Sequence, residues 1–251
     1  MGLLFVVGFL IAGFFPPPSP NLSAAEVAAM IEADRNAIRI GIVICLASCG
    51  LLMPFMTAFT IQMRRIEGSR SILAYTQLAL ATMATLEFVI PYVFMLVSTY
   101  REDTDPEVTR ALFDIGWFFF LGVICTFVMQ LAIFGVVILM DRREEPVFPR
   151  WLGYTNLWLS LMFTPASFIV FFKTGPLAWN GVFVWWVPVT AFLLWFLPNF
   201  AMLLRAVDKD ELAPIESQDA LEAEFAILRA RVDALTGSLS GAGSGSASQR
   251  T

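Results

Sequence analysis

The chain has 251 residues, of which 58% are hydrophobic and only 15% are charged, and its net charge is −5. An ordinary water-soluble domain carries about 25% charged residues, so this composition predicts a lipid-solvated protein and excludes a soluble enzyme. The sequence has no histidine and only three cysteines, which excludes imidazole metal sites, Ser-His-Asp triads and haem held by histidine. It also offers no basic face for nucleic acid.

Six apolar stretches approach the roughly twenty residues that a helix needs to cross a bilayer. They cover residues 2–15, 37–63, 71–100, 111–140, 151–172 and 183–207. The first would be only ~21 Å long as a helix, so it can be a half-span, a mismatched span or the core of a signal peptide. Because no Lys or Arg precedes it and Pro16 follows closely, we favour a retained short helix. The fold class is therefore all-α, a membrane bundle of about six transmembrane helices over residues 1–207.

Arginine and lysine in the short loops predict the orientation of these helices. Eight positive charges follow the second, fourth and sixth stretches: Arg64, Arg65, Arg70, Arg142, Arg143, Arg150, Arg205 and Lys209. The loop over residues 101–110 is instead dominated by four carboxylates, and the last loop contributes only Lys173. We therefore predict a multi-pass protein of the bacterial inner membrane with both termini in the cytoplasm.

Two helix starts are predicted from local signals. Ser23 and Glu26 have the spacing of a capping box, so a helix should begin near Ala24 and can continue into the second stretch. Asp105 before Pro106 is a second start signal, because Asp caps well and Pro fits the first helical position. Five prolines lie within the spans and should bend them. The bends can line a cavity, or the prolines can simply reflect how common proline is in membrane helices. They are Pro54, Pro91, Pro165, Pro188 and Pro198.

Three ionisable residues lie within the apolar stretches: Arg39, Glu87 and Asp114. Counted along their helices, they fall at similar depths, so we predict that they form one polar layer. A charge within a bilayer costs at least ~2–3 kcal/mol on insertion scales, so Glu87 should face protein or water, stay protonated, or find a partner. The layer is interpreted either as a ligand or ion site or as a structural Arg–carboxylate clamp.

Amides and thiols inside the spans are interpreted as structural. Gln77, Gln130 and Asn156 should form a second polar layer that contributes interhelical hydrogen bonds. The three cysteines, Cys45, Cys49 and Cys125, are too few to hold a metal without histidine. We therefore expect no metal site, no cofactor and no catalytic residue.

Residues 208–237 differ abruptly in composition from the preceding spans, and they predict a cytoplasmic amphipathic helix with a two-heptad coiled-coil seam. Self-association through this helix is favoured over an interfacial or intramolecular role, because an interfacial helix normally displays many basic residues. Residues 238–251 are rich in Gly and Ser and are predicted to be disordered. The predicted oligomerisation residues are Leu221, Glu224, Phe225, Leu228, Arg229, Val232 and Leu235.

Five motifs lie in or beside the loops and the second stretch: Phe15-Pro-Pro-Pro-Ser-Pro20, Ile38-Arg-Ile-Gly41, Gln62-Met-Arg-Arg-Ile-Glu67, Pro146-Val-Phe-Pro-Arg-Trp-Leu-Gly-Tyr154 and Phe172-Lys-Thr-Gly-Pro-Leu-Ala-Trp-Asn-Gly181. In these motifs the chain resembles an uncharacterised family of bacterial multi-pass membrane proteins. The resemblance covers residues 16–205 and implies the multi-pass topology, with occurrence in bacteria that degrade steroids and other hydrophobic compounds. It implies no catalytic or binding residue.

These features predict a non-enzymatic membrane protein that forms a homo-oligomer and provides a transport, channel or binding route for a small hydrophobic molecule. Its partners would be the bilayer, further copies of the chain, and a hydrophobic small molecule or lipid. The alternative is an accessory or scaffold subunit of a larger membrane complex, whose C-terminal helix pairs with a partner.

Overall fold

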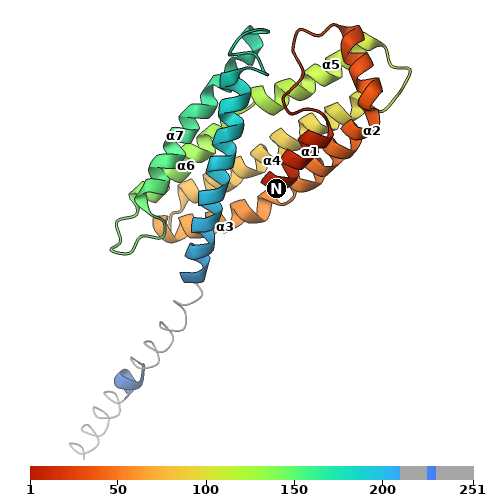
Figure 1. Cartoon of the computed structure of the whole chain (residues 1–251). Coiled ribbons are helices and arrows are strands. Elements are labelled where there is room, and N and C mark those ends of the chain that lie inside the picture. Colours follow the sequence, from red (N-terminus) through yellow and green to blue (C-terminus); the bar gives the residue numbers. More distant parts are fainter. Residues whose placement is uncertain (210–224, 230–251) are drawn as a thin grey trace, which may run out of the picture. The chain divides into compact units, whose positions relative to one another are not determined.

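The structure, a computed structural model, describes residues 1–209 and 225–229 (Figure 1). Within these ranges the regular elements are all helical, as predicted. Five helices are long and apolar enough to cross a membrane: Ala24–Glu67, Ile72–Ser98, Pro106–Met140, Arg150–Phe171 and Val182–Lys209. The contacts described below all lie within the compact unit Met1–Leu203.

The first apolar stretch forms a helix, but a short one. This helix, α1 (Gly2–Ile11), has ten residues and is therefore ~15 Å long. It covers about half of a hydrocarbon layer that is ~30 Å thick. The structure thus supplies five full-length apolar helices where the sequence predicts six crossings.

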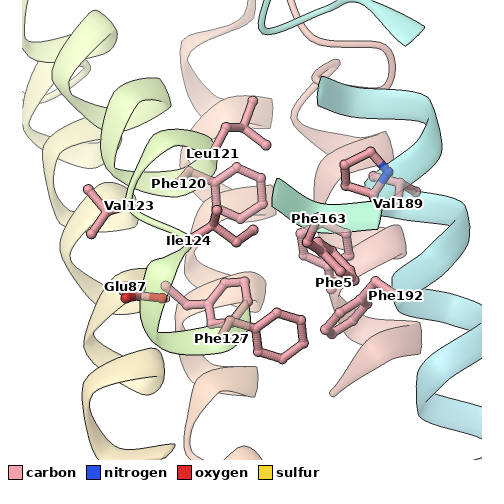
Figure 2. A pocket seen from close by; sticks show the side chains of 12 residues that line it. Phe5, Glu87, Phe120, Leu121, Val123, Ile124, Phe127, Phe163, Val189 and Phe192 are labelled. Atoms are coloured by element: carbon pink, nitrogen blue, oxygen red, sulfur yellow. The ribbon is translucent and has the colours of Figure 1, made fainter. Parts of the chain in front are cut away.

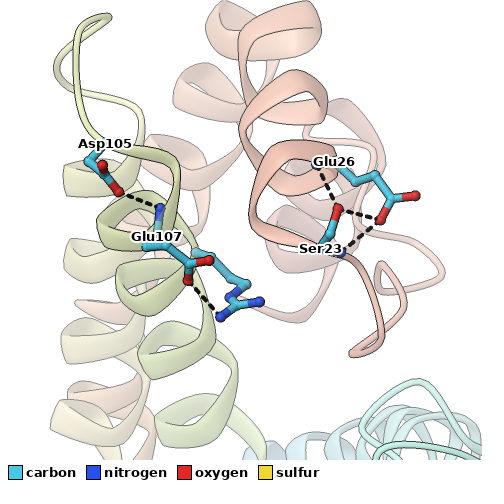
Figure 3. Close-up of polar contacts among 5 residues, drawn as sticks. Ser23, Glu26, Asp105 and Glu107 are labelled. Atoms are coloured by element: carbon cyan, nitrogen blue, oxygen red, sulfur yellow. Dashed lines mark hydrogen bonds and ion pairs between the residues drawn. The ribbon is translucent and has the colours of Figure 1, made fainter.

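Both predicted helix starts are confirmed (Figure 3). Helix α2 (Ala24–Cys49) opens with a complete capping box, in which Ser23 Oγ accepts from the Glu26 N–H at 3.3 Å and the Ser23 N–H donates to the Glu26 carboxylate at 2.7 Å. Helix α5 (Pro106–Trp117) opens with the Glu107 N–H donating to Asp105 Oδ1 at 2.8 Å. Side chains that satisfy the free N–H groups of a first turn fix where each helix begins.

Helix α2 is followed closely by α3 (Leu52–Glu67), which lengthens this segment well beyond one membrane crossing. Residue Asp34 has non-helical backbone angles and kinks α2, and Gly50 and Leu51 separate α2 from α3. Pro54 lies just after this interruption, where its missing N–H leaves no helical hydrogen bond unmade.

Helix α4 (Ile72–Ser98) is capped at both ends by side chains from other helices. The Glu67 carboxylate accepts from the Leu73 and Ala74 N–H groups at 3.0 and 2.6 Å. At the other end the Arg35 and Arg39 guanidinium groups donate to the Thr99 carbonyl at 2.8 and 2.5 Å. A carboxylate at the N-terminus and guanidinium groups at the C-terminus both complement the helix dipole.

Glycines allow two helix pairs to approach closely. Gly8 of α1 meets Gly41 of α2 backbone to backbone, and α1 lies along α2 (Figure 1). In the same way Gly135 of α6 (Cys125–Met140) faces Gly153 of α7 (Arg150–Phe163). Small residues at such crossings let backbones pack tightly in the absence of a hydrophobic driving force in lipid.

The loops gather at two ends of the helical unit. At one end, Arg143 donates to the Arg65 carbonyl at 3.0 Å, which links the 141–149 loop to the end of α3. At the other end, Trp179 Nε1 donates to the Pro18 carbonyl at 2.7 Å, which links the loops 172–181 and 12–23. We refer to these as the Arg143 end and the Lys173 end.

Asp141 organises the loop at the Arg143 end. Its carboxylate accepts from the Val147 N–H at 2.9 Å and from Arg143 Nε at 3.0 Å. Burial alone would raise the pKa of Asp141, but the hydrogen bonds from Val147 and Arg143 and the charge of Arg143 outweigh it, so the pKa lies below its ordinary value. The carboxylate therefore stays ionised at neutral pH and holds the loop.

Candidate functional site

Three of the long helices lose regular geometry near the same level of the bundle. The helix that begins as α5 passes through a π-helical turn, η1 (Phe118–Gly122), and is interrupted at Val123 and Ile124 before α6 begins. Helix α7 tightens into a 3₁₀ segment, η2 (Thr164–Phe171), and the last span opens with a π-helical turn, η3 (Val182–Trp186). Irregular backbone at membrane depth persists only where it is buried in protein or lines a cavity.

Glu87 of α4 lies directly beside the interruption between η1 and α6. Its carboxylate accepts a hydrogen bond from the Thr126 hydroxyl, and the Thr126 backbone N–H lies next to the same carboxyl group. Thr126 belongs to the first turn of α6, which has no side-chain cap of its own. The positive end of the α6 dipole and its free N–H groups therefore stabilise an anion at this position.

An apolar pocket adjoins this carboxylate. It has a volume of about 60 Å³ and includes Glu87, the interrupted segment at Val123 and Ile124, and Pro188 at the start of the last helix. Figure 2 shows the phenylalanine rings around the same space as Glu87. The ring-bearing residues are Phe5, Phe88, Phe120, Phe127, Phe163 and Phe192.

The pocket lies between two groups of packed rings, which keep its walls in place. Phe120 stacks on Phe5 with ring centroids 5.9 Å apart and packs edge to face on Trp117 at 6.1 Å. On the opposite side Phe127 packs edge to face on Trp195 with centroids 5.4 Å apart. Offset and edge-to-face pairs of this kind each contribute ~0.5–1.5 kcal/mol beyond their buried area. The site is thus one carboxylate in an aromatic pocket at a broken membrane helix.

No protein family, curated protein or solved structure matches this chain. The site therefore has to be interpreted from its own geometry, and the resemblance to an uncharacterised membrane family stays a prediction.

The structure does not bring Arg39, Glu87 and Asp114 into one layer. The Arg39 guanidinium caps the C-terminus of α4 at Thr99 and Tyr100, twelve residues or ~18 Å along the helix from Glu87. Asp114 lies in a separate pocket at the Lys173 end. The predicted depths differ from the observed ones because residue counts within each stretch do not show how α2 and α4 are offset along their axes; Arg39 lies beside Thr99, which follows the last residue of α4.

Gln77 and Gln130 converge on one methionine. Gln130 Nε2 donates to Met56 Sδ at 2.9 Å, and Gln77 Nε2 lies 3.7 Å from the same sulfur. Thr60 Oγ1 also donates to Gln77 Oε1 at 2.5 Å. All of these side chains are buried, and together they connect α3, α4 and α6.

Asn156 belongs to a different network from these glutamines. Its Oδ1 accepts from Trp195 Nε1 at 2.8 Å, and its Nδ2 donates to Asn199 Oδ1 at 3.1 Å. Asn199 and Trp195 are both fully buried. The amides predicted as one layer therefore form two networks between helices, and in the glutamine network Gln130 Oε1 stays without a hydrogen-bond partner.

The predicted oligomerisation helix lies largely outside the described residues. Leu221, Glu224, Val232 and Leu235 are not described, whereas residues 225–229 are helical. Within that segment Phe225 and Leu228 are exposed, at 64% and 51%, and Arg229 is exposed as well.

The cysteines have dissimilar surroundings. Cys45 and Cys49 are buried beside α1, and the Cys45 thiol lies 3.6 Å from the Phe5 carbonyl. Cys125 is exposed at the start of α6. Among the residues that the structure describes, no group of Cys, Asp and Glu could hold a metal ion.

Sequence reasoning missed the residues that complete the site. Thr126 was not singled out, because a threonine in a membrane helix usually bonds to its own backbone and gives no sign of a distant partner. Weak signals were present, since Gly122 ends η1, Pro165 lies at the start of η2 and Pro188 closely follows η3. Their shared level could be recognised only after the helices were placed side by side.

Proposed function

We propose that this protein is a non-enzymatic membrane protein that binds and passes on a small, mainly apolar molecule in the pocket beside Glu87. The observation that carries this proposal is a carboxylate held at the N-terminus of a broken transmembrane helix and open to an aromatic pocket. Discontinuous helices with such termini form the substrate sites of many transporters. An ionisable residue within a membrane is by default a candidate functional site.

The size of the pocket favours a slender ligand. An engineered cavity of ~150 Å³ accommodates benzene, and this pocket measures about 60 Å³. A fused-ring molecule does not fit in this conformation, whereas one end of an alkyl chain does. The Glu87 carboxyl group adds a single polar contact, so the best ligand is a chain-like molecule with one hydroxyl or amino group.

Filling the pocket should abolish binding. We expect Val189→Phe to reduce the binding of pentanol at least about tenfold, because Val189 lines the pocket and the larger ring takes up its limited volume. Binding is measured by saturation-transfer NMR on the full chain in deuterated detergent. Val136→Phe is the matched control, since Val136 lies on α6 outside the pocket with 43% exposure.

The two variants separate pocket binding from simple partitioning into the detergent. Equal signals from Val189→Phe, Val136→Phe and the unmodified protein would contradict the proposal. Thermal unfolding of each variant, recorded in the same detergent, identifies any loss of signal that comes from misfolding.

We also propose that the C-terminal helix joins copies of this chain in the bacterial inner membrane, with the C-terminus in the cytoplasm. The support is the heptad spacing of residues 221–235 and the exposed apolar side chains of Phe225 and Leu228. Tethering helices to one membrane patch raises their effective concentration to millimolar levels, which compensates for the shortness of two heptads.

Removing residues 210–251 should convert an oligomer into a monomer in mild detergent. Particle mass from light scattering before and after truncation measures this change. A full-length chain that is already monomeric, or that copurifies stoichiometrically with other subunits, favours the accessory-subunit alternative instead.

A further inference from the structure

A second pocket lies at the Lys173 end, away from Glu87. It has a volume of about 130 Å³ and is bordered by Arg110 and Asp114 of α5, Lys173 of the 172–181 loop, and Pro20 of the 12–23 loop. Trp179, also in its wall, is 5% exposed and donates to the Pro18 carbonyl. This hydrogen bond fixes the two loops against each other, so the pocket is preformed.

The pocket combines a polar edge with an apolar lipid-facing side. Arg110 and Lys173 are the cations that interact electrostatically with Asp114. Phe118, Val170 and Phe172 line the same pocket and remain 39%, 62% and 42% exposed. Exposed apolar side chains on membrane-spanning helices contact acyl chains, so the ligand should carry charge at one end and hydrocarbon at the other.

The balance of charges determines which headgroup fits. Arg110 forms an ion pair with Glu107 at 2.7 Å, so two cations, Arg110 and Lys173, lie beside two carboxylates, Glu107 and Asp114. Such a group has no net charge and suits a neutral zwitterion better than an anion. A guanidinium has five N–H donors, which leaves Arg110 able to bind a phosphate while it is paired with Glu107.

We infer that this pocket binds the phosphoethanolamine headgroup of a phospholipid, with the phosphate on Arg110 and Lys173 and the ammonium on Asp114. The acyl chains then lie on Phe118, Val170 and Phe172. An ethanolamine ammonium donates hydrogen bonds to a carboxylate, whereas a choline group has no N–H to donate. The site therefore distinguishes ethanolamine from choline through Asp114, and zwitterionic from anionic lipids through its neutral charge balance.

Native mass spectrometry of the full chain, incubated with phosphatidylethanolamine, phosphatidylcholine or phosphatidylglycerol, tests this assignment. We expect phosphatidylethanolamine to be retained most strongly.

Lys173→Gln should weaken the binding of phosphatidylethanolamine about tenfold by removing a charge-assisted hydrogen bond, and Lys173→Arg should restore it. Asp114→Asn should abolish the preference for ethanolamine over choline while phosphate binding persists. Arg70→Gln is the control, since Arg70 is an exposed cation outside the pocket.

Several results would overturn the inference. One is equal retention of the three lipids by the unmodified protein, and another is unchanged binding by Lys173→Gln. A third is binding of free glycerophosphoethanolamine as tightly as the lipid, because it would assign the pocket to a water-soluble phosphoethanolamine compound. Val189→Phe fills the Glu87 pocket and tests the proposed function only. The lipid comparisons at the Lys173 end do not depend on its result, so the two proposals can fail separately.

Discussion

Glu87→Gln is expected to leave the protein folded and to weaken the binding of pentanol about tenfold. The glutamine retains an oxygen that can accept from the Thr126 hydroxyl, so the start of α6 keeps its partner. Glutamine cannot ionise, and hydrogen bonds to charged groups contribute ~1.5–3 kcal/mol against ~0.5–1.5 kcal/mol for neutral ones. Saturation-transfer NMR measures the affinity for pentanol, and thermal unfolding measures the stability.

Two comparisons make this prediction specific. Hexane has the same length as pentanol, with a methyl group in place of the hydroxyl, so its binding should not change in Glu87→Gln. Glu102→Gln, in the exposed loop before α5, should behave like the unmodified protein. If Glu87 is only a structural clamp, Glu87→Gln will lower the melting temperature while both probes bind as before, and the proposed site would then be wrong.

Glu87→Ala should differ from Glu87→Gln in stability as well as in binding. Alanine leaves the Thr126 hydroxyl and the first turn of α6 without the acceptor that the structure provides. An unsatisfied buried polar group costs ~1–3 kcal/mol. The alanine variant should therefore unfold at a lower temperature than the glutamine variant.

Gly41→Ala is expected to displace α1 and to destabilise the protein by about 1–3 kcal/mol. The added Cβ would overlap the Gly8 carbonyl oxygen and would lie 2.7 Å from the Ala12 nitrogen and 2.8 Å from the Ala12 Cβ. None of these atoms belongs to a flexible side chain, so the clash is relieved only if the whole helix moves. Phe5 of α1 lines the pocket, which means that the displacement also disturbs ligand binding.

Thiol labelling measures this displacement directly. Cys45 is completely buried, and its thiol faces the Phe5 carbonyl, so maleimide should modify it only after α1 moves. The experiment uses a Cys125→Ser background, because Cys125 is exposed.

Gly50→Ala is the matched control for Gly41→Ala. The nearest atom to its added Cβ is 3.8 Å away, and Gly50 has ordinary helical backbone angles. This substitution should be neutral or stabilising by ~0.4–1 kcal/mol, because it restricts the unfolded chain. Equal stability and equal labelling of the two variants would show that α1 does not depend on the contact at Gly41.

The helices and their starts follow from the sequence because their causes are local. Ser23 meets Glu26 and Asp105 meets Glu107 across two or three residues, so the capping partners can be recognised in the printed chain. The apolar stretches predict membrane helices in the same way, since each helix satisfies its own backbone hydrogen bonds in lipid.

The candidate site depends instead on contacts between distant segments. The partner of Glu87 is 39 residues away at Thr126, and the partner of Arg39 is 60 residues away at Thr99. The sequence identified both ionisable residues as exceptional within apolar stretches, but it placed them in one layer, because it gave no measure of how the helices are offset along their axes in the bundle.

By itself, the sequence determined that this chain is helical, that most of it suits lipid, and that Glu87 needs shielding there. Only the tertiary structure decided what shields it: the interruption after η1 lies beside the carboxylate, and the pocket there is lined by η1 residues and by residues just before η2 and just after η3. The physical reason is the distance along the chain between the residues that interact. Hydrogen bonds within a helix join neighbours in the chain, whereas a cavity is the space left between helices, and its shape depends on how all of them pack.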